Sequence, residues 1–226
     1  GVIAADSKAN AQDVLKAAEQ AFKAKNSVAV VLRINSPGGS PVQAGQIYQG
    51  LRDLQVSYPE KPFYAVIEDL GASGGYYLAV AAPTILADPS SLVGSIGVVA
   101  GGFGFTKAIE KLGIERRVYT AGDNKAFLDP FSQPSKEQED FWQGILNSTH
   151  QQFIARVKES RGAKLSNNPQ LFSGLVWNGE LALEEGLIDE LGSLYSLQKQ
   201  LGLSQVVDYS PEPNPLQLLE KHLGSL

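Results

Sequence analysis

Ser73 is flanked by small residues at a point where the sequence changes from extended to helical character. Residues 71–75 read Gly-Ala-Ser-Gly-Gly, between an apolar run at 65–67 and a helix-forming run at 76–82. Glycines allow a tight turn and the close approach of a substrate, so a serine here could be an exposed nucleophile. The amide of Gly74 could then donate to a developing oxyanion. The segment fits G-x-S-x-G, but glycines are common in this chain, so its function depends on which base serves Ser73.

A histidine base would make this turn similar to that of α/β-hydrolases, in which an acid and then a histidine follow the serine. The chain has two histidines, His150 and His222. His150 lies in a polar part of an expected helix, and His222 lies near the C-terminus, beyond a cluster of prolines. Both positions are more typical of surface histidines than of catalytic ones.

A lysine base must be neutral at the working pH, which requires desolvation or a neighbouring cation. Lys125 follows an expected strand at 115–120 and a turn at 121–124, and it precedes the apolar residues 126–128. A lysine in this position could be partly buried. From these residues alone, an ordinary loop lysine remains the simpler interpretation.

Two further glycine-containing segments could complete such a site. Residues 35–39 (Asn-Ser-Pro-Gly-Gly) end an apolar run, and their free amides could supply a second oxyanion donor beside Gly74. Residues 94–97 (Gly-Ser-Ile-Gly) place the hydroxyl of Ser95 in an apolar turn, where it could orient a lysine amine. Taken alone, each segment is more simply interpreted as a plain turn between a strand and a helix.

The composition excludes several classes of protein. The 226 residues contain no cysteine, so thiol catalysis, thiolate metal sites and disulfides are excluded. Two histidines are too few for a His-rich metal site, and a net charge of −5 without a basic run argues against nucleic-acid binding. No apolar run is long enough to span a membrane. Because the chain begins with glycine and lacks methionine, we expect any signal or anchor to lie upstream.

Helical and extended patterns alternate along the chain. Helices are expected at 10–24, 41–56, 76–82, 105–112, 135–160, 178–186 and 216–223. Strands are expected at 28–34, 63–67, 84–87 and 115–120, and a strand or turn at 187–191. This alternation predicts a layered α/β fold with a mainly parallel sheet and right-handed crossovers. We expect one domain over 1–208, followed at 209–226 by a Pro-rich linker and an amphipathic helix.

Five segments, taken in order, resemble the signal peptide peptidase A family of Ser-Lys serine proteases. The similar segments are 32–39, 72–77, 92–98, 120–125 and the C-terminal signature at 177–189 (Trp-Asn-Gly, then Gly-Leu-Ile-Asp). Each motif is weak alone, but their order and spacing together are specific. The resemblance extends over about residues 10 to 195, and it favours the short, single-repeat form, because one unit carries both serine and lysine.

The resemblance implies a role for each candidate residue. It implies that Ser73 is the nucleophile, Lys125 the general base and Ser95 the serine that orients the lysine, with the amides of Gly39 and Gly74 as the oxyanion hole. It also implies a crotonase-like or caseinolytic-protease-like fold, with no metal and no organic cofactor.

The resemblance further implies the setting of the enzyme. Members of this family are membrane-anchored through an N-terminal segment, which would lie outside this sequence together with the usual first strand. Their protease domain is extracytoplasmic and forms a homo-oligomer. The expected substrate is an extended apolar peptide, such as a remnant signal peptide or part of a membrane-associated protein, because few charges lie near the motifs.

Two other classes of function use parts of the same sequence pattern. An acyl-CoA hydratase or isomerase of this fold class would use the same oxyanion amides with acidic residues as acid and base, leaving Ser73 and Lys125 without a role. A non-catalytic scaffold would bind a peptide without cutting it.

Overall fold

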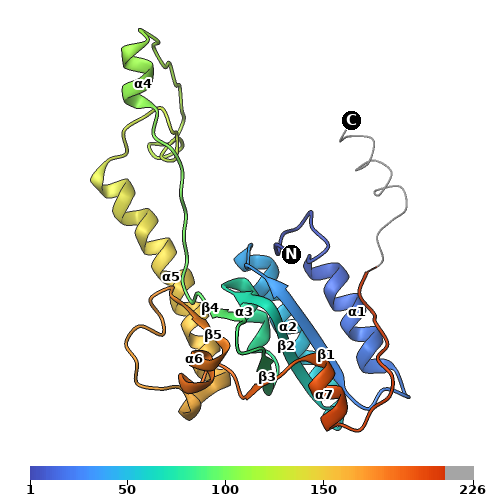
Figure 1. Ribbon diagram of the computed structural model, residues 1–226. Helices are drawn as coiled ribbons and strands as arrows, with labels where there is room; N and C mark the ends of the chain where they lie inside the picture. Colours follow the sequence, from blue (N-terminus) through green and yellow to red (C-terminus); the bar gives the residue numbers. More distant parts are fainter. Residues whose placement is uncertain (212–226) are drawn as a thin grey trace, which may run out of the picture. The chain divides into compact units, whose positions relative to one another are not determined.

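Strand β2 is the centre of a six-stranded sheet in the computed structural model, which describes residues 1–211 (Figure 1). The strands are β1 (Val30–Ser36), β2 (Phe63–Ala72), β3 (Thr84–Ala87), β4 (Leu92–Gly94), β5 (Val176–Asn178) and β6 (Glu190–Leu191). β2 pairs in parallel with β1 along one edge and with β3 and then β4 along the other. β6 pairs in parallel with β3, and β5 pairs antiparallel with β4. The predicted α/β architecture with a mainly parallel sheet is confirmed.

Both faces of the sheet are covered, as the apolar character of its strands predicts. The helices are α1 (Ala11–Lys23), α2 (Pro41–Ser57), α3 (Gly74–Ala79), α4 (Thr106–Lys111), α5 (Lys136–Arg161), α6 (Gly179–Glu184) and α7 (Leu194–Gln200). Side chains alternate along β2, so that Ala65 and Ile67 join the main core. Val66 joins a smaller cluster on the other face, with Leu86 and with Leu197 of α7.

Local hydrogen bonds explain where several helices begin. The side chains of Asn10, Ser40 and Asn178 each accept from a backbone amide in the first turn of α1, α2 and α6. Before α5, Ser135 and Gln138 accept from each other's backbone amides, which is the predicted capping box. These caps use only neighbouring residues, and for that reason the sequence pattern locates them well.

The chain divides into two compact units. The first comprises residues 1–97 together with the chain from Phe153 onward, and it contains the whole sheet and both apolar clusters. The second unit is Val98–Gln152, which contains α4 and the beginning of α5. None of the residues of this second unit is buried.

The predicted strand at 115–120 is wrong. These residues are exposed and pair with no other strand in the described part of the chain. Arg117 instead pairs with Glu115 (2.7 Å), and Arg116 pairs with Asp129 (3.1 Å). An alternating pattern produces a strand only where a neighbouring strand is present to receive its hydrogen bonds.

Three short elements were not predicted, namely β4, β5 and α7. The predicted helix at 216–223 lies outside the described residues. Within residues 1–211, the helices do not combine the length and the apolar character that crossing a membrane requires.

A buried ion pair fixes the end of α5 to the segment before β6. The guanidinium of Arg161, with 1% of its side chain exposed, donates to both carboxylate oxygens of Asp189 at 2.8 and 3.1 Å. Asp189 also accepts from Lys164 Nζ at 2.6 Å and from the amide of Ile85 at 2.8 Å. Burial by itself raises the pKa of Asp189, but the hydrogen bonds from Arg161, Lys164 and Ile85 outweigh it, so the pKa lies below its ordinary value.

This lowered pKa predicts the acid sensitivity of the fold. The stabilisation is present above the unfolded-state pKa of Asp189, about 4, and is lost as the pH falls through the lower folded-state value. We expect Asp189→Asn to lower the free energy of unfolding by about 3–5 kcal/mol at neutral pH, because Arg161 then lacks its counter-ion. Urea unfolding should also show a weaker dependence on pH between about pH 5 and pH 2.5 than in the wild type. An unchanged pH dependence would contradict this account.

Candidate active site

Ser73 has a strained backbone at the junction of β2 and α3. β2 ends at Ala72, α3 begins at Gly74, and Ser73 between them has φ 52° and ψ −122°. Such a conformation costs a non-glycine residue about 1–3 kcal/mol and persists only where the surroundings enforce it. Here the Ser73 amide donates to the carbonyl of Gly94 (2.8 Å), and its carbonyl accepts from the amide of Tyr77 (2.9 Å). The junction has the geometry of a turn that exposes a nucleophile.

The loop after β1 lies directly against this serine. A β-carbon at position 38 would lie 2.6 Å from the nitrogen of Gly74 and 3.0 Å from Oγ of Ser73, and Gly38 has φ +100°. Only glycine fits there, for reasons of both space and backbone conformation. The buried hydroxyl of Ser36 accepts from the Gly38 amide (3.1 Å) and holds the turn.

Within residues 1–211, the backbone amides of Gly39 and Gly74, near Ser73, have no hydrogen-bond acceptor. The two glycines are close together, since a β-carbon at position 74 would lie 3.3 Å from the Gly39 nitrogen. The N-terminal segment fixes the loop, because the Ile3 amide donates to Gly38 (2.9 Å) and the Ile3 carbonyl accepts from Ser40 (2.7 Å). A pair of free, fixed amides beside a hydroxyl is able to hold an oxyanion.

Ser95 has the second strained backbone. Within residues 1–211, Ser73 and Ser95 are the non-glycine residues with positive φ, and the value for Ser95 is 50°. The Ser95 amide donates to the carbonyl of Leu175 (2.8 Å), and the preceding residue, Gly94, accepts from Ser73. Strain of this kind tends to occur at functional sites, so its presence at both predicted serines supports their assignment.

Trp177 of β5 is a neighbour of the site for which sequence reasoning gave no role. A β-carbon at position 94 would lie 3.0 Å from Cδ1 of Trp177, so the indole packs closely against Gly94. Its buried Nε1 has no hydrogen-bond partner among the described residues. The signal in the sequence was the Trp-Asn-Gly motif.

Lys125 belongs to the second unit, whereas Ser73, Ser95, Gly39 and Gly74 belong to the first. Lys125 lies in a turn in which its amide donates to the carbonyl of Gly122 (3.1 Å). Its side chain is exposed within the described residues, which differs from the partial burial that the sequence suggested. The pairing of Lys125 with Ser73 therefore stays a prediction.

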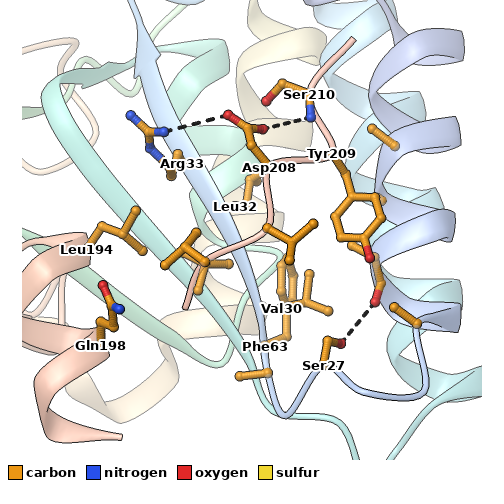
Figure 2. A pocket seen from close by; sticks show the side chains of 18 of the residues that line it. Ser27, Val30, Leu32, Arg33, Phe63, Leu194, Gln198, Asp208, Tyr209 and Ser210 are labelled. Carbon is orange, nitrogen blue, oxygen red and sulfur yellow. Dashed lines mark hydrogen bonds and ion pairs between the residues drawn. The ribbon is translucent and has the colours of Figure 1, made fainter. Parts of the chain in front are cut away.

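A groove in the first unit lies away from these residues. A groove of about 780 Å³ runs along α1, β1, α7 and residues 203–211, where Arg33 points toward Asp208 with 4.0 Å between their charged atoms (Figure 2). None of the predicted site residues lines this groove. Within residues 1–211, no group of three His, Cys, Asp or Glu side chains is arranged to hold a metal. His222 lies outside the described residues.

The sequence matches a protein-family model and several known proteins. The model of peptidase family S49 matches residues 57–207. A protein described as the Na(+)/H(+) antiporter NhaA of Brucella abortus is 51% identical over 185 residues, which are 81% of this chain and 25% of that protein. Protease 4 of Haemophilus influenzae is 34% identical over 169 residues, 74% of this chain and 27% of that protein. The chloroplastic serine protease SPPA of Arabidopsis thaliana is 31% identical over 185 residues, 81% of this chain and 27% of that protein. The chain thus spans about a quarter of the length of each of these three relatives.

The fit of Gly38 against Ser73 predicts the effect of a single methyl group. We expect Gly38→Ala to slow the reaction of Ser73 with a fluorophosphonate by about 10²-fold or more, because the methyl displaces Ser73 Oγ and the Gly74 amide. Gly45→Ala is the matched control, since a β-carbon there meets nothing within 4 Å and alanine favours the helix. The labelling rates are measured by mass spectrometry. An equal rate in both variants would contradict the assignment of Ser73 as the nucleophile.

Proposed function

Because the chain belongs to peptidase family S49, a family of serine proteases, we propose that it is a serine endopeptidase with Ser73 as nucleophile. The mixed, mostly parallel sheet is consistent with the crotonase-like and caseinolytic-protease-like fold of that family. The observation that carries the proposal is the strained Ser73 beside the free amides of Gly39 and Gly74. These groups supply the nucleophile and the charge stabilisation that acyl transfer needs.

The proposed base is Lys125. In its neutral form it accepts the Ser73 proton while Oγ attacks the peptide carbonyl, and the amides of Gly39 and Gly74 stabilise the tetrahedral oxyanion. The lysine then gives this proton to the leaving amine, and water hydrolyses the acyl-enzyme. Ser95 orients the lysine amine. Its fixed backbone and its closeness to the Ser73 segment through Gly94 support this role.

The proposed substrate is an extended apolar peptide from a signal-peptide remnant or a membrane-associated protein. An apolar side chain lies near the nucleophile, since Ile3 Cδ1 would lie 3.4 Å from a β-carbon at position 74, and Ile96 beside Ser95 is buried. On the basis of the family resemblance, we also propose that the full-length protein is anchored in a membrane and that its protease domain is extracytoplasmic.

Removal of either member of the dyad should abolish turnover. We expect Ser73→Ala and Lys125→Ala each to lower kcat for peptide hydrolysis by about 10³-fold or more. Lys107→Ala, an exposed lysine of the same unit, is the control and should retain wild-type activity. Because the base must be neutral, wild-type activity should rise with pH until Lys125 is deprotonated.

Assays on the same variants distinguish the proposed peptidase from the alternative functions. Peptidase activity that persists in Lys125→Ala with a flat pH profile would remove this lysine from the mechanism, and dependence on His150 or His222 would indicate a histidine base. Turnover of a CoA thioester that survives Ser73→Ala would favour the hydratase or isomerase. Binding of a peptide without cleavage would favour the scaffold.

A homo-oligomer is the second part of the proposal. The Val98–Gln152 unit exposes large apolar side chains, among them Val99 and Tyr119 at 91% exposure and Phe103 at 81%. Apolar groups exposed together in this way are typical of an interaction surface. Further copies of this chain are the proposed partners, as the family resemblance implies.

Charged substitutions test the assembly directly. We expect Tyr119→Asp to lower the mass measured by analytical ultracentrifugation, because an aspartate would be desolvated in the interface. Tyr195→Asp is the control, at 67% exposure on α7 in the first unit, and should not alter the mass. A wild type that sediments as a monomer would contradict the proposed assembly.

A further inference from the structure

Residues 186–189 (Gly-Leu-Ile-Asp) form hydrogen bonds with side chains of two helices, α3 and α5. From α3, Tyr76 Oη donates to the carbonyl of Leu187 at 2.7 Å. From the end of α5, Arg161 Nε donates to the carbonyl of Gly186 at 2.9 Å, beside the two bonds to Asp189. The same short segment therefore receives a hydrogen bond from each helix, and we call it the bracket.

The Arg161 contact is specific to arginine. The guanidinium is buried and donates three hydrogen bonds in a fixed planar arrangement, two to Asp189 and one to the Gly186 carbonyl. A lysine has a single flexible ammonium and cannot reproduce this fork. A buried charge is tolerated only with such complete pairing, so the end of α5 has one well-defined position on the bracket.

The Tyr76 contact connects the bracket to the nucleophile. Tyr76 is completely buried three positions after Ser73, and the amide of the next residue, Tyr77, donates to the Ser73 carbonyl. Burial raises the pKa of the Tyr76 phenol, so the group remains a neutral donor. The bracket thus holds the first turns of α3, on which the conformation of Ser73 depends.

The bracket therefore bears on the position of Ser73 through α3. A displacement of about 1 Å at a reacting group can cost about 10²-fold in rate.

We propose that Arg161 and Tyr76 are positioning residues, which act through the bracket to fix the first turn of α3 and so the conformation of the nucleophile Ser73. The inference rests on the proposed Ser-Lys peptidase. It adds two residues to the reaction that touch neither the substrate nor the reacting atoms.

Two conservative variants test this role. We expect Arg161→Lys, which keeps the charge and loses the fork, to lower kcat by about 10- to 100-fold with KM changed less than about threefold. We expect Tyr76→Phe, which removes one oxygen atom, to lower kcat by about 3- to 10-fold.

The control is Lys164→Ala. This lysine pairs with Asp189 from the solvent side and is 53% exposed, so its loss leaves the Arg161 fork and should change kcat less than about twofold. Rates are expressed per site titrated with a fluorophosphonate, so that loss of folded protein does not count as loss of kcat. If Arg161→Lys does not fold, Tyr76→Phe decides.

The outcomes are distinguishable. Variants that melt at a lower temperature but keep the wild-type kcat would show that the bracket is only structural, and would leave the proposed function intact. A wild type without peptidase activity would overturn both the proposed function and this inference.

Discussion

The left-handed backbone of Ser73 is the constraint on which the arrangement of the first unit depends. This conformation is unfavourable for any residue with a side chain, yet it projects the hydroxyl from the junction between β2 and α3. Several independent contacts enforce it. β4 pairs with the last residues of β2 and presents the Gly94 carbonyl to Ser73, and the Gly38 turn lies against Oγ on another side. The sheet, the glycine turns and the first turn of α3 thus all help to hold the backbone of Ser73 in this conformation.

The same constraint explains why glycines and serines occur where they do. Position 38 admits no β-carbon because Ser73 and the Gly74 amide occupy that space, and position 39 admits none because the Ile3 carbonyl lies 2.1 Å away from where it would be. Ser95 is strained in the same sense as Ser73, although glycine would be easier to accommodate there. Keeping a hydroxyl at an unfavourable position is readily explained by chemistry and poorly explained by packing.

Structural features that depend on adjacent residues could be predicted from the sequence, and those that depend on distant residues could not. Caps such as Ser135, and the turn around Ser73, are encoded by adjacent residues, and they were located correctly. The strand predicted at 115–120 failed, and β4 and β5 were missed, because a short strand is defined by a distant partner that no local pattern reveals. The ion pair between Arg161 and Asp189 could not be predicted from the sequence for the same reason. The Ser73–Lys125 pairing was predicted from resemblance alone, because no local pattern relates residues that belong to two different units.

The two halves of the proposed site differ in what stabilises them. The serines and the oxyanion amides lie in a unit with a closed core, so their geometry is set by packed strands and exists before any substrate arrives. Lys125 lies in a unit that contains no buried apolar residue and therefore gains little hydrophobic stabilisation against the entropy of ordering. The proposed base therefore lies in the less stabilised unit, whereas the proposed nucleophile is held by a packed core.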